Sequence, residues 1–327
     1  MDSRSQSFFR LAMAAVAVVF IGSQSIQAQV SPGMFLKPWA QEPHWADTVD
    51  EPIFMDSGKT KGTEHDTDVI YYDSYGRIKL DQDNANPDFA IGYRVMTLEL
   101  GSDHPELPGG ATDINIGGAF RLGELAPDWD VHLLAGVGTA TDNHFDNGDA
   151  VYGIGTLHAI RQVDPRSAWH VGITFDGNRT FLPDTPLPYA VYMRQASPEL
   201  AYAVGVPASW LQWQVDQNLS VNLRYVVPYN LAATADYKVV EWLSVFADYK
   251  RNLDAFYIHD RDTERLFYDV TRVSTGLRMK SEWIDLSVGL GYAFEQELSR
   301  GRDVQDTDTI TDLTDEPFLF FTIRGTF

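Results

Sequence analysis

The chain contains no cysteine, few basic residues and no apolar run long enough for a membrane-spanning helix. Its 327 residues include 25 Lys and Arg against 46 Asp and Glu, which gives a formal net charge of −21 at pH 7. Without cysteine, the fold has neither disulfide bonds nor a thiolate metal site. The acidic excess argues against a nucleic-acid partner, because basic side chains supply most of the affinity for phosphate backbones. We expect no nucleic-acid partner and no cofactor.

The first 28 residues have the layout of a secretory signal peptide. Arg4 and Arg10 precede an apolar run over residues 11–22, and small and polar residues follow up to Ala28, after which we expect cleavage. The apolar run has about a dozen residues, fewer than the ~20 that a spanning helix needs. Since no later segment supplies such a run, any membrane insertion must use strands.

The last 45 residues alternate between apolar and small or polar side chains, as a β-strand with two different faces does. Apolar side chains occupy every second position from Ile284 to Phe294, and Asp285, Ser, Gly and Ala stand between them. A second alternating run ends the chain at Phe327. This pattern is typical of a sheet closed into a barrel, with lipid outside and a polar interior.

Similar runs recur from residue 89 onward, separated by turn-forming residues, and no segment has sustained helical periodicity. We predict an all-β fold, a single antiparallel transmembrane β-barrel of about 12 strands (12–14) over residues 68–327. An irregular periplasmic segment over residues 29–67 precedes it. Long polar linkers, such as 252–264 and 299–316, alternate with short ones, which is typical of barrels with long external loops and short periplasmic turns.

The C-terminal run resembles the insertion signal of Gram-negative outer-membrane barrel proteins, which typically end in Phe with apolar residues at alternate positions before it. Leu319, Phe321, Ile323 and Phe327 match that signal, whereas Gly325 departs from it. The resemblance implies a location in the cell outer membrane, with outer-membrane lipid and the outer-membrane assembly machinery as partners. Deleting Phe327, or converting Phe321 to Asp, is then expected to block assembly.

Roughly residues 85–327 resemble a family of uncharacterised bacterial barrel proteins that is defined as a domain of unknown function. The residues that carry this resemblance are Leu187-Pro188-Tyr189, the turn from Gly205 to Trp210, Asp236-Tyr237, and the glycine-rich segment 289–294. The resemblance implies an outer-membrane location and supplies no activity.

Charged side chains within the predicted strands are assigned to the inward face, because an Arg or Lys that faces lipid at mid-depth costs about 2–4 kcal/mol. The candidate lumen-lining residues are Arg94, Arg224, Lys238, Asp248, Lys250, Arg272, Arg278, Asp285 and Arg324. One interpretation is a pore or binding cavity of mixed charge. The other, which we favour, is an interior filled by ion pairs.

Catalytic and metal chemistry has little support in the sequence. His132, His158 and His170 lie in separate predicted strands and can meet in a barrel interior, but they form no ligand-spaced pair. A Ser and a His in the wall would suit a phospholipid hydrolase, but no motif places them together. The acidic residues of 303–316 offer oxygen ligands to calcium, although their spacing fits a solvated external loop better. We assign no catalytic and no metal-binding residue and expect that the chain is not an enzyme.

The leading functional interpretation is passive transport or binding of small solutes or lipids through an outer-membrane barrel, with the solute unidentified. One alternative is a structural or surface-interaction barrel with a blocked lumen. Another is a barrel enzyme that acts on lipids. Channel conductance separates the first two, and loss of hydrolysis on Ser or His substitution tests the third.

Overall fold

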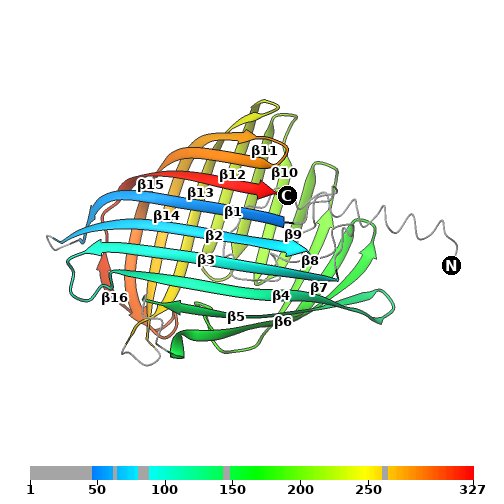
Figure 1. The fold of residues 1–327 in the computed structure, drawn as a ribbon. Helices are drawn as coiled ribbons and strands as arrows, with labels where there is room; N and C mark the ends of the chain where they lie inside the picture. Colours follow the sequence, from blue (N-terminus) through cyan, green and yellow to red (C-terminus); the bar gives the residue numbers. More distant parts are fainter. Residues whose placement is uncertain (1–45, 62–64, 80–87, 143–147, 260–263) are drawn as a thin grey trace.

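The computed structural model describes residues 46–61, 65–79, 88–142, 148–259 and 264–327. These residues form an antiparallel β-sheet that closes on itself (Figure 1). The expected signal peptide over 1–28 and the following residues 29–45 lie outside the described residues. Within the described ranges, no helix is long and apolar enough to cross a membrane.

The elements follow one another as a series of hairpins. In chain order they are β1 Ala46–Lys59, β2 Asp66–Lys79, β3 Phe89–Ser102, β4 Gly110–Ala126, β5 Trp129–Thr141, the 3-10 turn η2 Gly148–Ala150, β6 Val151–Asp164, β7 Ser167–Asp176, β8 Leu187–Gln195, β9 Leu200–Val206, β10 Ala208–Gln214, β11 Leu219–Val226, β12 Asn230–Val240, β13 Leu243–Tyr257, β14 Arg265–Lys280, β15 Ile284–Gly301, β16 Thr307–Asp312 and β17 Glu316–Thr326.

Sixteen of the strands form the barrel wall. Sequence neighbours pair antiparallel from β1 to β15, then β15 pairs with β17 and β17 with β1, which closes the ring. The closing ladder pairs Asp47 with Thr326. Among the described ladders, β16 pairs with the outer part of β15 alone, so it extends one strand of the wall. The prediction of an all-β antiparallel barrel is confirmed, but the expected number of about 12 strands is wrong.

Two wall strands, β1 and β8, do not follow the pattern that predicts strands, because they contain proline and charge in place of an apolar alternation. β1 occupies residues 46–59 of the segment expected to be irregular, and Pro52 falls in a gap of its ladder with β17. β8 has Pro188 as its second residue, and proline is tolerated at such a strand start. The expected loops 252–264 and 299–316 likewise contain strand, namely the ends of β13 and β15 and all of β16.

The barrel has two unlike ends. Ala46 and Phe327 lie at one of them, here called the terminal end, which is on the right in Figure 1 near the letter C. Connections at this end include the short turns 127–128, 165–166, 215–218, 241–242 and 281–283. The opposite end, here called the loop end, carries longer connections such as 177–186, together with the short turns at residues 207 and 227–229. The predicted alternation of long and short linkers therefore corresponds to the two ends of one barrel.

Paired residues share a face of the sheet, so the ladders separate an outward set from an inward set. The outward set is apolar and open: Ile116, Leu157, Val204, Leu290 and Leu319 are between 51% and 65% exposed. On β15 the alternation is as the sequence predicts, with Leu290 outward and glycine, serine and alanine inward.

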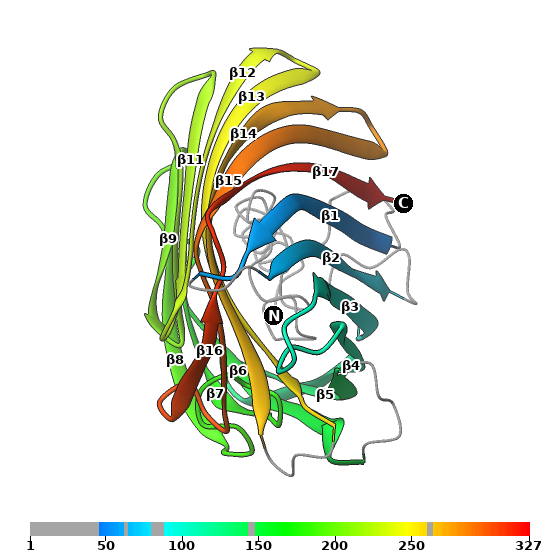
Figure 2. The same cartoon turned by 90° about the vertical axis from the view of Figure 1, so that its left-hand side faces the viewer.

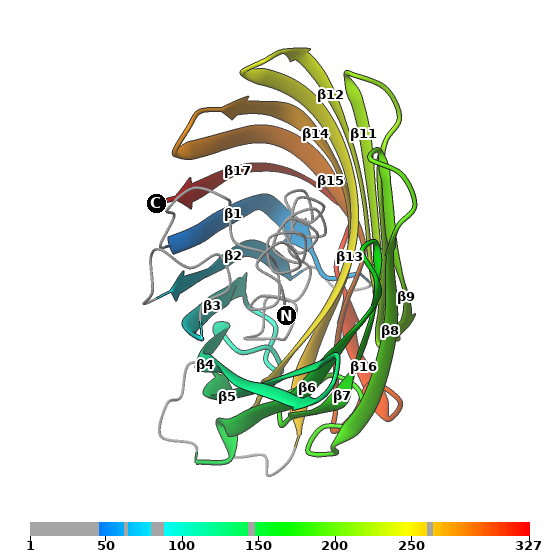
Figure 3. The ribbon, with the colours of Figure 1, turned by 90° about the vertical axis from the view of Figure 1, so that its right-hand side faces the viewer.

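The strands of the wall are short on one side of the barrel, here called the low side, and long on the other. β8 to β12 have 7–11 residues, whereas β13 to β15 have 15–18. About 9–11 residues of tilted strand are enough to cross a bilayer. The surplus length of β13 to β15 lies at the loop end, where Figure 2 shows the yellow and orange strands crossing the ring. Figure 3, from the terminal end, shows β8 to β11 as a side wall opposite β1 to β4.

Candidate functional site

All nine candidate lumen-lining residues belong to the inward set. The β12–β13 and β13–β14 ladders connect Lys238 to Ser244 and Arg278, and Lys250 to Arg272. Asp285 is paired with Arg324 across β15 and β17. Arg94 pairs with Asn115 on β4, and Arg224 with Trp210 on β10. These nine residues are thus part of the charged surface of the inward face.

Ion pairs occupy much of this charged surface. Arg94 Nε lies 2.8 Å from Asp73 Oδ1 on the neighbouring strand β2. Lys250 Nζ lies 3.0 Å from Glu51 Oε1, although β13 and β1 are not neighbours in the wall. Arg278 pairs with Asp236. The sequence identified the cations but not their acidic partners, because strand pairing and contacts across the interior decide which carboxylate each one meets.

Among the nine residues, Arg272 is the most buried one whose side chain has hydrogen-bond donors without a partner in the described chain. It is 4% exposed, its guanidinium carbon lies 4.9 Å from the centre of the Tyr71 ring, and its Nη2 donates to Asn252 Oδ1 at 3.0 Å. Its Nε and Nη1 have no hydrogen-bond partner among the described residues. Leaving the donors of a buried guanidinium without acceptors is energetically costly.

The ends of β13 and β14 leave the wall and enter the barrel. Residues 252–256 and 265–268 are buried on both faces, whereas the rest of each strand alternates between buried and open positions. Continuous burial is typical of strands covered by protein on both sides. We call residues 252–257 together with 265–271 the inner hairpin.

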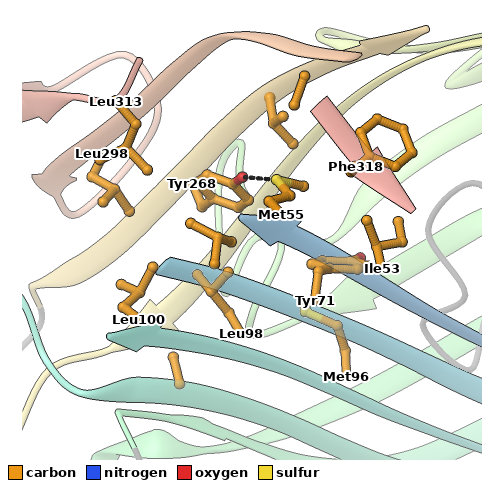
Figure 4. Packing of buried hydrophobic residues seen from close by; sticks show 14 of the residues in the cluster. Ile53, Met55, Tyr71, Met96, Leu98, Leu100, Tyr268, Leu298, Leu313 and Phe318 are labelled. Carbon is orange, nitrogen blue, oxygen red and sulfur yellow. Dashed lines mark hydrogen bonds between the residues drawn. The ribbon is translucent and has the colours of Figure 1, made fainter. Parts of the chain in front are cut away.

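One face of the inner hairpin packs on the inward faces of β1 to β4. Phe256, Tyr268 and Val270 join an apolar cluster with side chains of the opposite wall, including Leu98 and Leu100 (Figure 4). The other face, with Leu253, Ala255 and Phe267, packs against Tyr229 and Val304. Apolar contacts on both faces fill the space between the two walls at the loop end.

A backbone contact crosses the whole ring. Tyr257, the last residue of β13, forms a parallel bridge with Thr141, the last residue of β5. The amide of Asp142 donates to the Tyr257 carbonyl at 3.0 Å, and the amide of His259 donates to Asp142 Oδ2 at 2.9 Å. Eight strand-to-strand steps separate β5 from β13 in either direction around the ring. The inner hairpin therefore spans the loop end from one wall to the opposite wall.

Arg265 fixes the tip of this hairpin, where it pairs with Tyr257, to two loops. Its side chain is fully buried, with Nε and Nη2 donating to the Arg302 carbonyl at 3.1 and 2.6 Å. Its Nη1 donates to the Arg179 carbonyl at 3.0 Å and to Asn178 Oδ1 at 3.3 Å. The guanidinium also lies 5.0 Å from the Phe267 ring. The sequence did not reveal this role, because the acceptors are carbonyl groups in loops far along the chain.

The three histidines named from the sequence meet on the inward face. His132 is paired with His158 across β5 and β6, and His158 Nε2 lies 3.1 Å from His170 Nδ1. His158 Nδ1 also contacts the Tyr189 hydroxyl, and His132 Nε2 lies 3.3 Å from Asp130. None of these three rings is hydrogen-bonded to a serine among the described residues. In the same part of the chain, no group of three or more His, Asp or Glu is arranged to hold a metal ion.

The residues of the C-terminal signal point away from the interior. Leu319, Phe321 and Ile323 share the outward face of β17 and are 65%, 43% and 39% exposed. Phe327 follows the strand at the terminal end, where it exchanges two backbone hydrogen bonds with Ala46. These side chains have no part in the interior site.

No protein-family model and no curated protein matches the chain. The resemblance to a family defined as a domain of unknown function is therefore not supported by a family match. Among solved structures, the chain is similar to a TodX deltaS2S3 mutant, a monoaromatic hydrocarbon channel, with 8% identity over 88% of this chain and 91% of that one, and a TM-score of 0.39.

Two further similar structures are an outer-membrane channel and a porin. An outer-membrane channel from Pseudomonas putida F1 has 10% identity, 91% and 100% coverage and a TM-score of 0.36. The NanC porin has 8% identity, 86% and 100% coverage and a TM-score of 0.31. Identities this low, with TM-scores below 0.5, transfer no activity to this chain.

Proposed function

We propose that this chain is a β-barrel of the Gram-negative outer membrane that passes small solutes through its interior without an energy source. The observation that carries the proposal is the division of one closed wall into an apolar outward face and a polar inward face. A closed barrel satisfies every backbone donor and acceptor of the wall, which lipid requires.

The outward belt supports insertion into lipid. Its exposed apolar side chains come from strands all around the ring, with Ile116 on β4, Leu157 on β6, Val204 on β9 and Leu319 on β17. Soluble monomers rarely expose contiguous apolar surface on this scale, whereas a bilayer covers it. The expected signal peptide is consistent with export toward such a membrane. In this orientation the terminal end faces the periplasm and the loop end faces outward.

The low side of the wall supports a route for solutes. Inward side chains of β10 and β11 are polar and only half-buried, among them Gln212, Asn222 and Ser220. They contrast with the fully buried Leu98 and Leu266 of the packed side. The accessible part of the interior therefore lies along β8 to β12, and the apolar cluster occupies the part along β1 to β4 and β13 to β15.

A blocked barrel is the second candidate, and the inner hairpin favours it. The bridge between Tyr257 and Thr141 holds this hairpin across the loop end, where it can obstruct passage. A barrel that stays closed would serve through its external loops. The third interpretation, a lipid hydrolase, has no such observation, because none of the three inward histidines is hydrogen-bonded to a serine in the described chain.

Conductance separates the two candidates. The full-length protein, purified from outer membranes and checked for a faster-migrating unboiled band on a denaturing gel, is inserted into planar lipid bilayers. Stepwise conductance, increased in a variant whose residues 254–268 are replaced by a short Gly-Ser turn, supports transport through a gated interior. A heat-modifiable barrel without conductance, with and without the hairpin, contradicts transport and supports the structural candidate.

A further inference from the structure

Three basic residues stand in one row across the inward face. The ladders pair Trp210 with Arg224, Arg224 with Ala232, Ala232 with Lys250 and Lys250 with Arg272. Adjacent strands are about 4.8 Å apart, so the row spans roughly 15 Å from Arg224 to Arg272. We call Arg224, Lys250 and Arg272 the basic row.

The row holds like charges close together. Lys250 and Arg272 are directly opposite each other on neighbouring strands, an arrangement that is destabilising unless an anion lies between or beside them. Glu51 supplies one such anion, with its two oxygens 3.0 and 3.2 Å from Lys250 Nζ. Asp248 shares the face two residues away, and its Oδ1 has no hydrogen-bond partner among the described residues.

The two outer members of the row have donors to spare. Arg224 forms no ion pair or hydrogen bond with any described side chain and is half-buried on β11, next to Trp210. Arg272 is nine-tenths buried and keeps Nε and Nη1 without a partner in the described chain. Burying charged groups without partners is costly, so a hydrogen-bond acceptor that binds at the basic row would lower the energy of the folded protein.

The wall between Arg224 and the terminal end is polar and uncharged along β10 and β11. Its inward side chains are Gln212, Asn222, Gln214 and Ser220, all half-buried or exposed. The neighbouring carboxylate on β12, Asp236, is already paired with Arg278. Along β10 and β11, a negatively charged solute that enters from the terminal end meets hydrogen-bonding groups first and Arg224 next, with the exposed Lys238 on the neighbouring strand β12.

We propose that the basic row binds small oxyanions, carboxylates or phosphates, and makes the interior selective for anions. A guanidinium donates two parallel hydrogen bonds to such groups, which a lone lysine does not. Arg224 is the entry contact, and Arg272 ends the row at the inner hairpin. This inference rests on the proposed transport function, because it names the class of solute that the same interior carries.

Ion selectivity in planar bilayers tests the proposal. The reversal potential of the full-length barrel is measured under a potassium chloride gradient, for the unchanged protein and for Arg224→Glu and Arg224→Lys. Arg166→Glu is the matched control, because it makes the same charge change in an exposed turn outside the interior. We expect preference for chloride over potassium in the unchanged protein and reversal of that preference in Arg224→Glu. Arg224→Lys keeps the charge but not the paired donors, so its preference should keep its sign and become weaker, whereas Arg166→Glu should leave it unchanged.

A second measurement does not depend on conductance. Saturation-transfer NMR from the barrel in non-ionic detergent to acetate reports weak binding directly, and added inorganic phosphate competes. A signal that Arg224→Glu loses and Arg166→Glu keeps supports the oxyanion site even when the barrel does not conduct, in which case only the transport proposal fails. A conducting barrel whose selectivity is the same in Arg224→Glu as in the unchanged protein, or an acetate signal that survives Arg224→Glu, overturns the anion site.

Discussion

The substitution Arg265→Ala should release the inner hairpin from the loops that hold it. It removes four hydrogen bonds, two to the Arg302 carbonyl, one to the Arg179 carbonyl and one to Asn178 Oδ1. A buried acceptor left without a donor costs about 1–3 kcal/mol. Since water can enter beside a loop and offset part of this cost, we expect the docked state to lose about 3 kcal/mol relative to the undocked one.

A loss of about 3 kcal/mol raises the ratio of undocked to docked hairpin by roughly a hundredfold, because each 1.4 kcal/mol is a factor of ten. Hydrogen–deuterium exchange of peptides covering residues 252–271 should speed up accordingly, while exchange in β2 and β3 stays slow. Channel openings should become more frequent in the same variant. Both measurements use protein that is still heat-modifiable, so that loss of the barrel is not mistaken for release of the hairpin.

Arg300→Ala is the matched control for this experiment. Arg300 lies close to the same loops, but its pairs with Glu106 and Glu264 are both 3.4 Å long and partly exposed. Exposed pairs of this kind contribute about 0–1 kcal/mol. Exchange in the hairpin should therefore be almost unchanged in Arg300→Ala. Equal exchange in Arg265→Ala and the unchanged protein would refute the view that this guanidinium fastens the hairpin.

Three further outcomes are expected. Phe321→Asp places a charge on the lipid-facing side of β17 at a cost of about 2 kcal/mol, and cell fractionation should find the variant in the periplasm and not in the outer membrane. Gly291→Ala puts a Cβ into a phenylalanine ring, so its urea midpoint should fall by the equivalent of about 1–3 kcal/mol, whereas Gly109→Ala, which meets nothing within 4 Å, should match the unchanged protein. Glu51→Gln breaks the buried ion pair with Lys250 of β13 and should lower the free energy of unfolding by about 3–5 kcal/mol in the same assay. Asp66→Asn, which breaks an exposed pair, should have no measurable effect. Similar urea midpoints for the two variants would contradict the view that burial makes the Glu51 pair important.

The parts of this fold that the sequence predicts are those in which an apolar outward face alternates with a polar inward face. β15 and β17 alternate because one face must be apolar, and the same rule assigns charges such as Arg94 and Arg224 to the inward face. β1 does not show this alternation. Pro52 interrupts its ladder with β17, and Glu51 forms an ion pair with Lys250 of the distant strand β13. A local pattern contains no information about that partner.

The inner hairpin is hidden from sequence reasoning for a related reason. Residues 252–256 show no alternation, since both of their faces are buried in protein and neither meets lipid or water. A stretch with polar and apolar side chains in mixed order then looks like a loop. The contact among the three histidines is easier to predict from the sequence. They lie on adjacent strands at similar depth, so they are expected to meet once the strands pair.

The seam between β1 and β17 has a consequence for how the barrel is made. Asp47 and Thr326 stand at opposite ends of the described chain, and contacts of such sequence separation form late because a long loop must close first. The inner hairpin packs on β1 and β2, so it has no complete surface to dock on until the first strands have arrived. Closure of the β1–β17 seam and docking of the inner hairpin are therefore expected to occur together, late in the assembly of the barrel.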